Sequence, residues 1–363
     1  MALKDLNLQP KLYPMEKVVV GMSGGIDSTL TALKLKDRGF EVIGVTLLMW
    51  DSPASQKAIE DAQLQAKTIG VEHHVVCCQA DFKSKVVNHF ISSYLNGETP
   101  SPCAWCNPQI KWKYIADFAD SVGVHHISSG HYIEVAQHDG HHYVCKGIDP
   151  QKDQSYYLWM LPESIVRRMI QPLGNTTKIQ NKTEMVERNF EELIPNRESM
   201  SVCFLSGTDY RQFLFEHAPD KMSQVAGGDV LDEQGVKIGT HVGFPFYTIG
   251  QKRGLTLDVE REAYVSKMDR ATNSITVARK KDLLTHEFLV KDLHFINQNE
   301  ITPSTRLEVK VRGLGLNPEG AGSLRFMGDR AKVTLEQPAW AMSPGQPVVF
   351  YIDNRLVGGG ISL

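Results

Sequence analysis

The sequence predicts an α/β protein with three parts: a doubly wound parallel-sheet domain, a small mixed central domain and a C-terminal antiparallel domain resembling a β-barrel. Short apolar runs alternate with helical segments early in the chain, and short strands separated by Gly, Pro and Asn fill its end. A chain of 363 residues, at roughly 100–200 residues per domain, favours two or three domains. We place the domains at 1–206, 207–270 and 271–363.

Four strands separated by segments of helical length are expected in the first domain. We predict strands at Lys17–Met22, Phe40–Met49, Val71–Cys77 and Val124–Ser129, and helices at Ser28–Arg38, Gln56–Ile69, Phe82–Asn96 and Gln109–Val122. The first two strands are almost continuously apolar, which is typical of strands buried on both faces. Their alternation with helices indicates parallel βαβ units.

The rest of the chain has the pattern of short strands. From about Gly207 to Asp269, turn signals such as GGDVLDEQGVKIG indicate a small mixed domain. From Ala271 onward, the runs SITVAR, RLEVKVRG, GSLRFM, AKVTLEQ and VVFYID are separated by turn residues. This pattern is typical of a small antiparallel barrel or sandwich.

The composition limits the class of protein. With 42% hydrophobic and 22% charged residues, the chain is globular rather than mainly disordered. A net charge of -3 excludes a uniformly basic surface for nucleic acid, but it leaves room for a local basic patch. The first residues lack a signal peptide, and no run of about 18 apolar residues could span a bilayer, so we expect a cytoplasmic protein without a membrane partner. The six cysteines are then thiols, metal ligands or catalytic groups.

The segment Ser23-Gly24-Gly25-Ile26-Asp27-Ser28 lies between the first strand and the first helix. Glycines let the backbone approach a ligand closely, and a helix N-terminus favours an anion, so the loop suits a phosphate. Neither the Walker A pattern nor the dinucleotide fingerprint is present. The alternative is an ordinary glycine turn in which Asp27 or Ser28 caps the helix.

Two further segments contain candidate nucleophiles. Prolines on both sides of Cys103-Ala104-Trp105-Cys106 predict an extended approach to a helix that starts near Gln109. One or both thiols would then lie near a helix N-terminus, where the thiol pKa falls. Inert buried cysteines, a zinc half-site and a thioredoxin-like redox pair are the alternatives, although Cys77-Cys78 lacks the spacing of a second zinc pair. Cys203, in SMSVCFLSG, is on its own more typical of a packed small residue.

Taken in order, the motifs resemble a known family. SGGIDS resembles the SGGxDS loop of PP-loop ATP pyrophosphatases, which activate a carbonyl or carboxyl oxygen as its AMP ester. It is followed by PCAWCN, SSGHY, GIDPQKDQSYYLWML, SVCFLSG and YTIGQKRGL, and finally by Pro344-Gly345-Gln346 and Gly358-Gly359-Gly360. This ordered set covers almost the whole chain and resembles the tRNA-specific 2-thiouridylase family of that superfamily.

The resemblance implies a tRNA-uridine 2-sulfurtransferase. ATP, with Mg²⁺ expected, would convert the 2-carbonyl oxygen of the wobble uridine of tRNA into an adenylate. Sulfur would replace it, giving 2-thiouridine, AMP and pyrophosphate. By motif matching, Cys203 would carry the sulfur as a persulfide supplied by a sulfur-relay protein. Cys106 would assist sulfur release and form a transient Cys106–Cys203 disulfide that a reductant reopens.

The resemblance also implies which residues bind ATP and tRNA. The expected ATP contacts are Gly21, Met22, Ser23, Gly24, Gly25, Ile26, Asp27, Ser28, Met49 and Gly130. The expected tRNA contacts are Ser101, Pro102, Cys103 and His131 at the flipped base, Lys152, Asp153 and Gln154 in a loop, and Arg312, Gly313 and Gln346 in the C-terminal domain. Two basic clusters, Lys111-Trp112-Lys113 and Gln251-Lys252-Arg253, support tRNA binding. The support is only modest, because short basic runs are more often solvated faces.

One position departs from the family pattern. Many members read NPDxxCN, whereas this chain has Cys103 in place of the aspartate, which puts the role of that aspartate in doubt. A thiol could still transfer a proton, and Cys103, Cys106 and Cys203 would make three soft ligands suited to an iron–sulfur cluster. No other metal site is expected. A PP-loop ligase or amidotransferase would leave Cys106, Cys203 and the β domain unexplained, and the intact SGGIDS loop disfavours a non-enzymatic tRNA-binding module.

Overall fold

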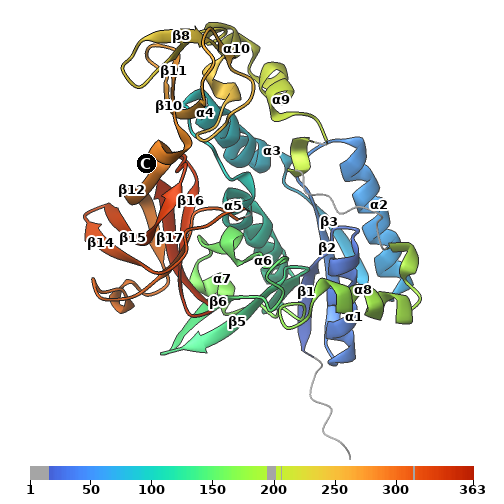
Figure 1. Cartoon of the computed structure of the whole chain (residues 1–363). Helices are drawn as coiled ribbons and strands as arrows, with labels where there is room; N and C mark the ends of the chain where they lie inside the picture. Colours follow the sequence, from blue (N-terminus) through green and yellow to red (C-terminus); the bar gives the residue numbers. More distant parts are fainter. Residues whose placement is uncertain (1–15, 194–201, 206, 314) are drawn as a thin grey trace, which may run out of the picture.

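Three sheets organise the part of the chain that the structure describes (Figure 1). The computed structural model describes residues 16–193, 202–205, 207–313 and 315–363. A four-stranded sheet comes first, then a five-stranded sheet, and last a larger sheet that contains the C-terminal strands. This arrangement confirms the predicted fold class. No helix in the described ranges is long and apolar enough to cross a membrane.

The first sheet is parallel throughout and has the strand order β3-β2-β1-β4. Its strands are β1 (Lys17–Gly21), β2 (Glu41–Leu48), β3 (Glu72–Cys77) and β4 (His126–Ser129). Val18 and Val20 of β1 pack with α1 (Ile26–Asp37) and α2 (Pro53–Thr68), whereas Val19 packs with α6 (Trp112–Ser121). Because alternate residues of a strand point to opposite faces, helices cover both faces of the sheet, as predicted for a doubly wound domain.

Two of the expected helices are longer and less regular than predicted. The segment expected to be one helix from residue 82 to 96 consists of α3 (Gln79–Phe82), the π-helical turn η1 (Lys83–Val87) and α4 (Asn88–Leu95). The helix expected to start near Gln109 begins at Pro102 instead, as α5 (Pro102–Cys106), and continues through the π-helical turn η2 (Asn107–Lys111) into α6. The predicted extended approach is therefore wrong, because proline is well tolerated in the first turn of a helix.

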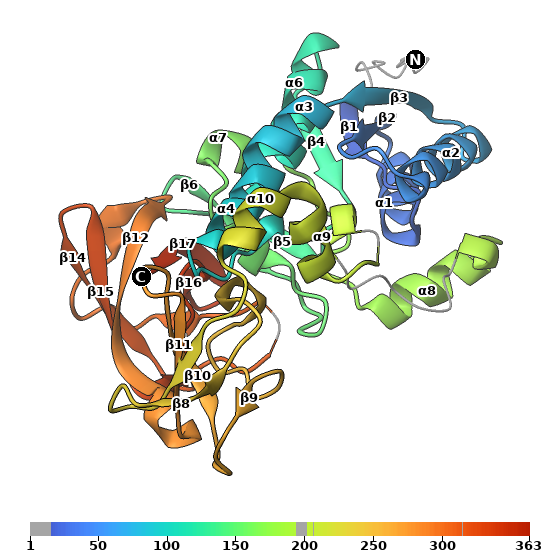
Figure 2. The same ribbon diagram turned by 90° about the horizontal axis from the view of Figure 1, so that it is seen from above.

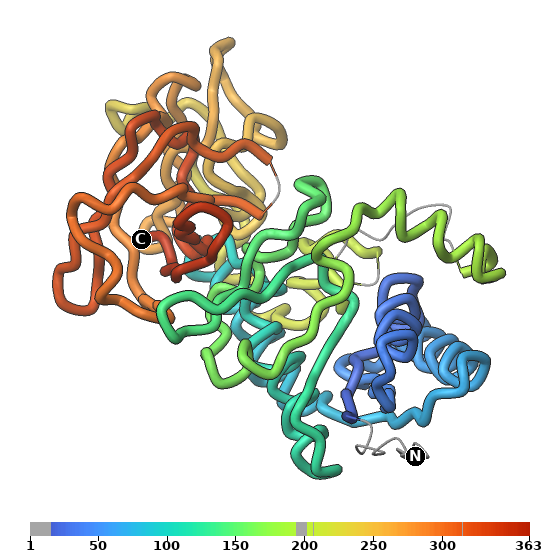
Figure 3. The backbone as a smooth tube through the Cα atoms, turned by 90° about the horizontal axis from the view of Figure 1, so that it is seen from below, coloured from blue at the N-terminus to red at the C-terminus, as the bar shows by residue number. Residues whose placement is uncertain are grey.

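A β-hairpin of the first domain joins the C-terminal sheet. Strands β5 (Ile133–His138) and β6 (His141–Lys146) pair with each other, and Cys145 pairs with Arg355 of the last strand. The hairpin lies beside the C-terminal strands (Figure 3). The other strands of this sheet are β12 (Leu284–Phe295), β13 (Glu308–Lys310), β14 (Gly322–Met327), β15 (Arg330–Trp340), β16 (Pro347–Ile352) and β17 (Arg355–Ser362). The first and last parts of the chain thus share one hydrogen-bonded sheet.

The middle sheet is mixed and has the order β10-β11-β7-β8-β9 (Figure 2). Its strands are β7 (Asp229–Leu231), β8 (Lys237–Thr240), β9 (Thr256–Leu257), β10 (Tyr264–Asp269) and β11 (Ser274–Ala278). The SITVAR segment forms β11, although the sequence prediction placed it in the C-terminal domain. β11 belongs to the middle sheet because it pairs with β10 and with β7. Both of these strands precede the domain boundary predicted at residue 270, whereas β11 follows it.

Short helices connect these sheets. They are α7 (Glu163–Val166), α8 (Lys178–Glu187), α9 (Tyr210–His217), α10 (Pro219–Gln224), and the 3₁₀ turns η3 (Ser155–Leu158), η4 (Glu191–Leu193), η5 (Cys203–Leu205), η6 (Phe244–Phe246), η7 (Lys280–Leu283) and η8 (Gln298–Glu300). The core of the middle sheet is continuous with α3, α4 and η5, since Val230 and Val265 share a buried cluster with Phe82, Phe90 and Phe204. The cysteine-bearing turn η5 is therefore held by the same core as the middle domain.

Candidate active site

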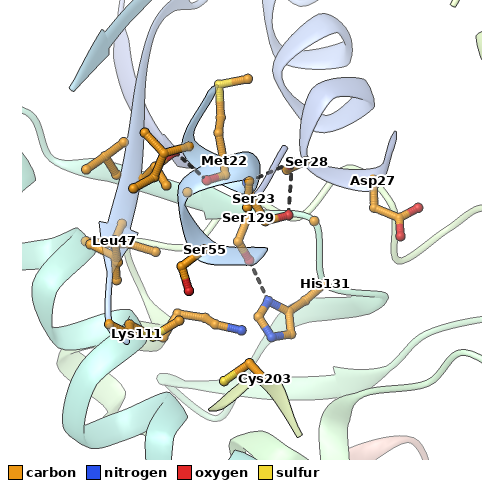
Figure 4. Close-up of a pocket in the computed structure, with 18 of the residues that line it drawn as sticks. Met22, Ser23, Asp27, Ser28, Leu47, Ser55, Lys111, Ser129, His131 and Cys203 are labelled. Carbon is orange, nitrogen blue, oxygen red and sulfur yellow. Dashed lines mark hydrogen bonds between the residues drawn. The ribbon is translucent and has the colours of Figure 1, made fainter. Parts of the chain in front are cut away.

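A cavity of about 620 Å³ lies at the carboxyl ends of β1, β2 and β4 (Figure 4). This is where ligands bind in open α/β sheets. The residues that line it come from distant parts of the sequence: Gly21, Met22, Ser23, Asp27, Ser28, Val45, Thr46, Leu47, Met49, Trp50, Ala54, Ser55, Ala58, Ile59, Lys111, Ile115, Ser129, Gly130, His131, Gln154 and Cys203. The structure thus brings most predicted ATP contacts together with His131, Gln154 and Cys203.

The SGGIDS loop has the geometry of an anion site. Gly25 is the N-cap of α1 and makes no side-chain capping hydrogen bond, so no capping side chain occupies the N-terminus of this helix, whose residues Asp27 and Ser28 line the cavity. The alternative in which Asp27 or Ser28 caps the helix is wrong, because both residues lie inside α1. Ser28 instead closes the loop, accepting a hydrogen bond from the Ser23 backbone N–H at 3.1 Å and donating one to the Gly25 carbonyl at 3.0 Å.

Gly24 fixes the path of this loop against α2. Its φ is +74°, and a Cβ there would lie 2.6 Å from the Ala58 carbonyl oxygen. The Gln65 amide donates to the Gly24 carbonyl at 2.7 Å. The cavity wall does not include Gly24, Gly25 or Ile26. These residues therefore determine the conformation of the loop and do not form the surface of the cavity.

Asp27 is held by side chains that the sequence reasoning missed. The ammonium of Lys178, on α8, lies 2.7 Å from both carboxylate oxygens of Asp27, and the Tyr132 hydroxyl donates to Asp27 at 2.7 Å. Asn181 in turn donates to the Tyr132 hydroxyl at 3.0 Å. Tyr132 lies in the SSGHY motif and could have been found there, whereas no local signal marks Lys178. This network fixes the carboxylate of Asp27 in the SGGIDS loop in one orientation.

The end of β4 forms another wall of the cavity. A Cβ at Gly130 would lie 2.8 Å from the Ser28 nitrogen and 2.9 Å from the Asp27 carbonyl carbon, so this backbone presses directly on the loop. The next residue, His131, is buried, and its Nδ1 lies 2.6 Å from the Ser129 hydroxyl. Burial lowers the His131 pKa well below its usual value, and the Lys111 charge adds to this effect. His131 is therefore neutral at pH 7.

The three candidate thiols lie close enough to influence one another. Burial raises the pKa of Cys106 to about 12, and it also raises the pKa of Cys103 and of Cys203, although these two residues reach the protein surface. The expectation that a helix N-terminus lowers the thiol pKa is wrong here, because loss of solvation outweighs the helix. Lys111 acts in the opposite direction on all three thiols. All six cysteines are free thiols, so the transient Cys106–Cys203 disulfide stays a prediction.

Aromatic packing holds Cys203 at the cavity. Its neighbour Phe204 is 2% exposed, and its ring centroid lies 5.1 Å from both Phe90 and Phe213 and 5.8 Å from Phe82. Trp50, which lines the cavity, contacts the same cluster. The motif around Cys203 thus has two functions: the aromatic side chain anchors the turn, and the adjacent thiol faces the cavity.

Truncating this anchor should loosen the thiol-bearing turn. We expect Phe204→Ala to lower the free energy of unfolding by about 3 kcal/mol, as for other buried phenylalanines, and to accelerate alkylation of Cys203. Urea denaturation and peptide mass spectrometry measure the two effects. Phe215→Ala is the matched control, because Phe215 is 49% exposed and lies outside this cluster. An equal loss of stability in the two variants would contradict the anchoring role.

Several predicted tRNA contacts are engaged within the protein. Asp153 accepts hydrogen bonds from the Ser155 backbone and hydroxyl and pairs with Lys310 of β13 at 3.0 Å. Its side chain is 4% exposed. Gln154 accepts from the Tyr132 N–H at 3.0 Å and lines the cavity, whereas neighbouring Lys152 does not line it. Asp153 therefore ties the loop to the C-terminal domain.

Among the predicted C-terminal contacts, Gly313 and the turn that contains Gln346 meet the first domain, whereas the hydrogen bonds of Arg312 lie within its own domain. Arg312 donates to the Trp340 and Ala341 carbonyls at 2.8 and 2.6 Å, and a Cβ at Gly313 would lie 2.5 Å from the Tyr157 hydroxyl. The Pro344-Gly345-Gln346 turn meets the segment before α5, where the Thr99 N–H donates to the Pro344 carbonyl at 2.7 Å. None of Ser101, Pro102, Cys103, Cys106, Arg312, Gly313 and Gln346 lines the cavity.

The structure separates the Lys111-Trp112-Lys113 cluster into three environments. Lys111 lines the cavity, Trp112 is fully buried, and Lys113 forms an exposed pair with Asp117. The two lysines therefore lie in different environments, and contact of this run with tRNA stays a prediction. The run lies where the π-helical turn η2 leads into α6, so the lysines do not share a face.

The described residues do not form a site that fits an iron–sulfur cluster. Within the described ranges, no group of three His, Cys, Asp or Glu side chains is arranged to hold a metal ion. Cys103, Cys106 and Cys203 influence one another's pKa, but they do not form such a ligand set.

The fold and the cavity define an ATP-binding protein of the HUP class. Three family models match in succession: the tRNA methyl transferase HUP domain over residues 16–207, the tRNA methyl transferase PRC-barrel domain over 211–279, and the aminomethyltransferase beta-barrel domain over 285–361. The chain is 38% identical over 352 residues to the tRNA-specific 2-thiouridylase MnmA 3 of Phocaeicola vulgatus, covering 95% of this chain and 93% of that protein. It is 34% identical over 357 residues to the tRNA-specific 2-thiouridylase MnmA of Cytophaga hutchinsonii, covering 95% and 96%.

The chain belongs to the tRNA-specific 2-thiouridylase family. Among solved structures, the U34-tRNA thiolase NcsA from Methanococcus maripaludis with its [4Fe-4S] cluster matches with a TM-score of 0.35 and 16% identity, over 57% of this chain and 67% of that chain. This likeness is too weak to transfer that cluster to the present chain.

Proposed function

We propose that this chain replaces the 2-oxygen of the wobble uridine of tRNA with sulfur, using ATP for activation and a cysteine persulfide as the sulfur source. The observation that carries the proposal is the shared cavity, into which the SGGIDS loop and Cys203 both open. A ligase acting on a small carboxylate would need the loop but not the thiol. The combination of both in one cavity fits activation followed by sulfur transfer.

The SGGIDS loop supports the first half of the reaction, the adenylation of the uridine. The N-terminus of α1 and the loop from Gly21 to Ser28 bind the phosphates of ATP, with Met49 beside the adenine and Gly130 closing the wall. Attack of the uridine 2-oxygen on the α-phosphate releases pyrophosphate and leaves the base as its AMP ester. The oxygen then departs with AMP, which is a far better leaving group than a carbonyl oxygen.

The thiols of Cys203 and Cys106 carry out the second half of the reaction, the transfer of sulfur. The terminal sulfur of the Cys203 persulfide attacks C2 of the activated base as AMP leaves. The Cys106 thiolate then attacks Cys203 Sγ, the S–S bond breaks, and its electron pair stays on the sulfur of the new 2-thiouridine. The product disulfide joins Cys106 to Cys203, and a thiol reductant must reopen it before the next turnover.

The proposed partners are tRNA and a persulfide-donating protein. The flipped base would enter beside His131 and α5, where Ser101 to Cys103 form the first turn. The predicted tRNA contacts at Lys152 to Gln154, at Arg312 with Gly313 and at Gln346 lie in or next to segments through which the first and C-terminal domains contact each other. Binding of tRNA there would therefore engage both domains. A thiol at position 103 offers a proton-transfer group where many relatives have a carboxylate.

Reconstitution tests this proposal. Purified chain, ATP with Mg²⁺, unmodified tRNA and a persulfide donor should yield 2-thiouridine together with AMP and pyrophosphate, measured by nucleoside mass spectrometry. Reactions without ATP or without the donor are the controls. If the chain formed AMP from ATP and a small carboxylate and yielded no thiolated tRNA, the result would contradict this proposal and support the ligase function.

A further inference from the structure

Lys111 lines the cavity, and the motif matching gave it no role in the reaction; the sequence offered only its basic cluster as modest support for tRNA contact. Among the described residues that line the cavity, it is the one lysine or arginine, and His131 beside it is neutral. No carboxylate of the described chain pairs with its ammonium group, whereas Lys113 pairs with Asp117 and Lys85 with Asp81. An uncompensated cation in a cavity indicates an anionic ligand or reaction intermediate.

The backbone of the π-helical turn η2 places the Lys111 side chain at the cavity. Lys111 is the last residue of the π-helical turn η2, which directly follows Cys106. Such turns are rare and are frequently found at functional sites, because they change the direction of the following side chains. In Figure 4, the ammonium of Lys111 points toward the His131 ring and the Cys203 side chain, and Ser23 and Ser28 of the phosphate loop lie farther along the cavity.

We propose that Lys111 is the cation that stabilises anionic sulfur on Cys203, and that it acts on the sulfur rather than on the nucleotide. The identity of Cys203 as sulfur carrier rests on the function proposed above. The titratable groups around this thiol in the described chain are Cys103 and Cys106 of α5, with His131 in the same cavity and Cys78 beyond Cys106. Among these neighbours, Lys111 is the only positive charge.

The positive charge of Lys111 opposes the effect of burial on the pKa of the Cys203 thiol. Burial raises the pKa of the Cys203 thiol, nearby Cys103 raises it further, and Lys111 lowers it. Removing the ammonium should therefore raise the pKa again and decrease the fraction of thiolate at neutral pH. An opposite charge close by typically shifts a pKa by about 1 unit or more, so the thiolate fraction should fall about tenfold.

The test measures alkylation of Cys203 by iodoacetamide from about pH 7 to about pH 12 in the full-length chain, without ATP or tRNA, with peptide mass spectrometry as the readout, because burial already raises the pKa of this thiol above its ordinary value. Lys111→Gln should shift the midpoint up by about one pH unit and slow alkylation at neutral pH about tenfold. Lys111→Arg should restore the wild-type midpoint, because it restores the charge. Lys113→Gln, which removes an exposed lysine two residues away, should leave the midpoint unchanged.

The outcomes separate the alternatives. An unchanged midpoint in Lys111→Gln overturns the proposal, and so does a raised KM for ATP without a shifted midpoint, since Lys111 would then bind nucleotide. A shift in both Lys111→Gln and Lys111→Arg, accompanied by a lower melting temperature, would indicate a packing role and also overturns it. If the wild-type chain thiolates no tRNA, the proposed function fails, while the alkylation result still decides the role of Lys111.

Discussion

Replacing Cys203 with serine is expected to lower thiolation from a persulfide donor by about a thousandfold or more, because serine cannot carry a persulfide and the covalent step is lost. ATP-dependent release of pyrophosphate should persist, since adenylation needs the SGGIDS loop and not the thiol, and Ser23 and Ser28 of that loop line a different side of the cavity from Cys203 (Figure 4). The measurements are nucleoside mass spectrometry for 2-thiouridine and an assay of released pyrophosphate for the adenylation step.

Cys77→Ser is the matched control for this experiment. Cys77 is an exposed thiol at the end of β3, it donates to Gln79, and it does not line the cavity. We expect its thiolation rate to match that of the wild type. Full activity of Cys203→Ser with the persulfide donor would contradict the assignment of Cys203 as sulfur carrier.

The second large effect is expected from Gly130→Ala. The added Cβ would lie 2.8 Å from the Ser28 nitrogen and 2.9 Å from the Asp27 carbonyl carbon, and backbone atoms cannot move aside as a flexible side chain can. The phosphate loop must therefore shift, and a displacement of about 1 Å in a reacting group commonly lowers the rate about a hundredfold. We expect a loss of that size in ATP-dependent AMP formation, measured as pyrophosphate release.

Gly123→Ala controls for a general loss of stability. Gly123 has a φ of +69° at the end of α6, and nothing lies within 4 Å of its added Cβ. Alanine there costs about 1 kcal/mol of conformational strain without touching the cavity. Equal effects of the two substitutions on AMP formation would show that the space around Gly130 is not decisive.

The parts of the site that the sequence could predict are those encoded locally. The SGGIDS loop was recognisable because a strand, a glycine turn and a helix are consecutive in the chain, and Ser23, Asp27 and Ser28 of this loop line the cavity. The start of α5 was misplaced because Pro102 fits both an extended segment and the first turn of a helix. Only tertiary packing decides between these two conformations.

Other features depend on contacts between distant segments and leave no local pattern. Lys178 reaches Asp27 across 151 positions of sequence, from a helix that looks like any polar surface helix. Lys111 looked like one member of a basic run until the π-helical turn placed it in the cavity. The expectation of a lowered thiol pKa failed for the same reason, because solvation depends on the whole surrounding structure.

The pairing of β17 with the β5–β6 hairpin has a consequence for how the chain folds during its synthesis. β17 pairs with β6, β12 and β16, and it is synthesised after all three of them. Until β17 emerges from the ribosome, the strands that flank its place have exposed edges, and such edges recruit other chains. A strand of the third domain thus completes the hydrogen bonding of a sheet begun in the first half of the chain, so the β5–β6 hairpin of the first domain stays without this partner until the third domain has been made.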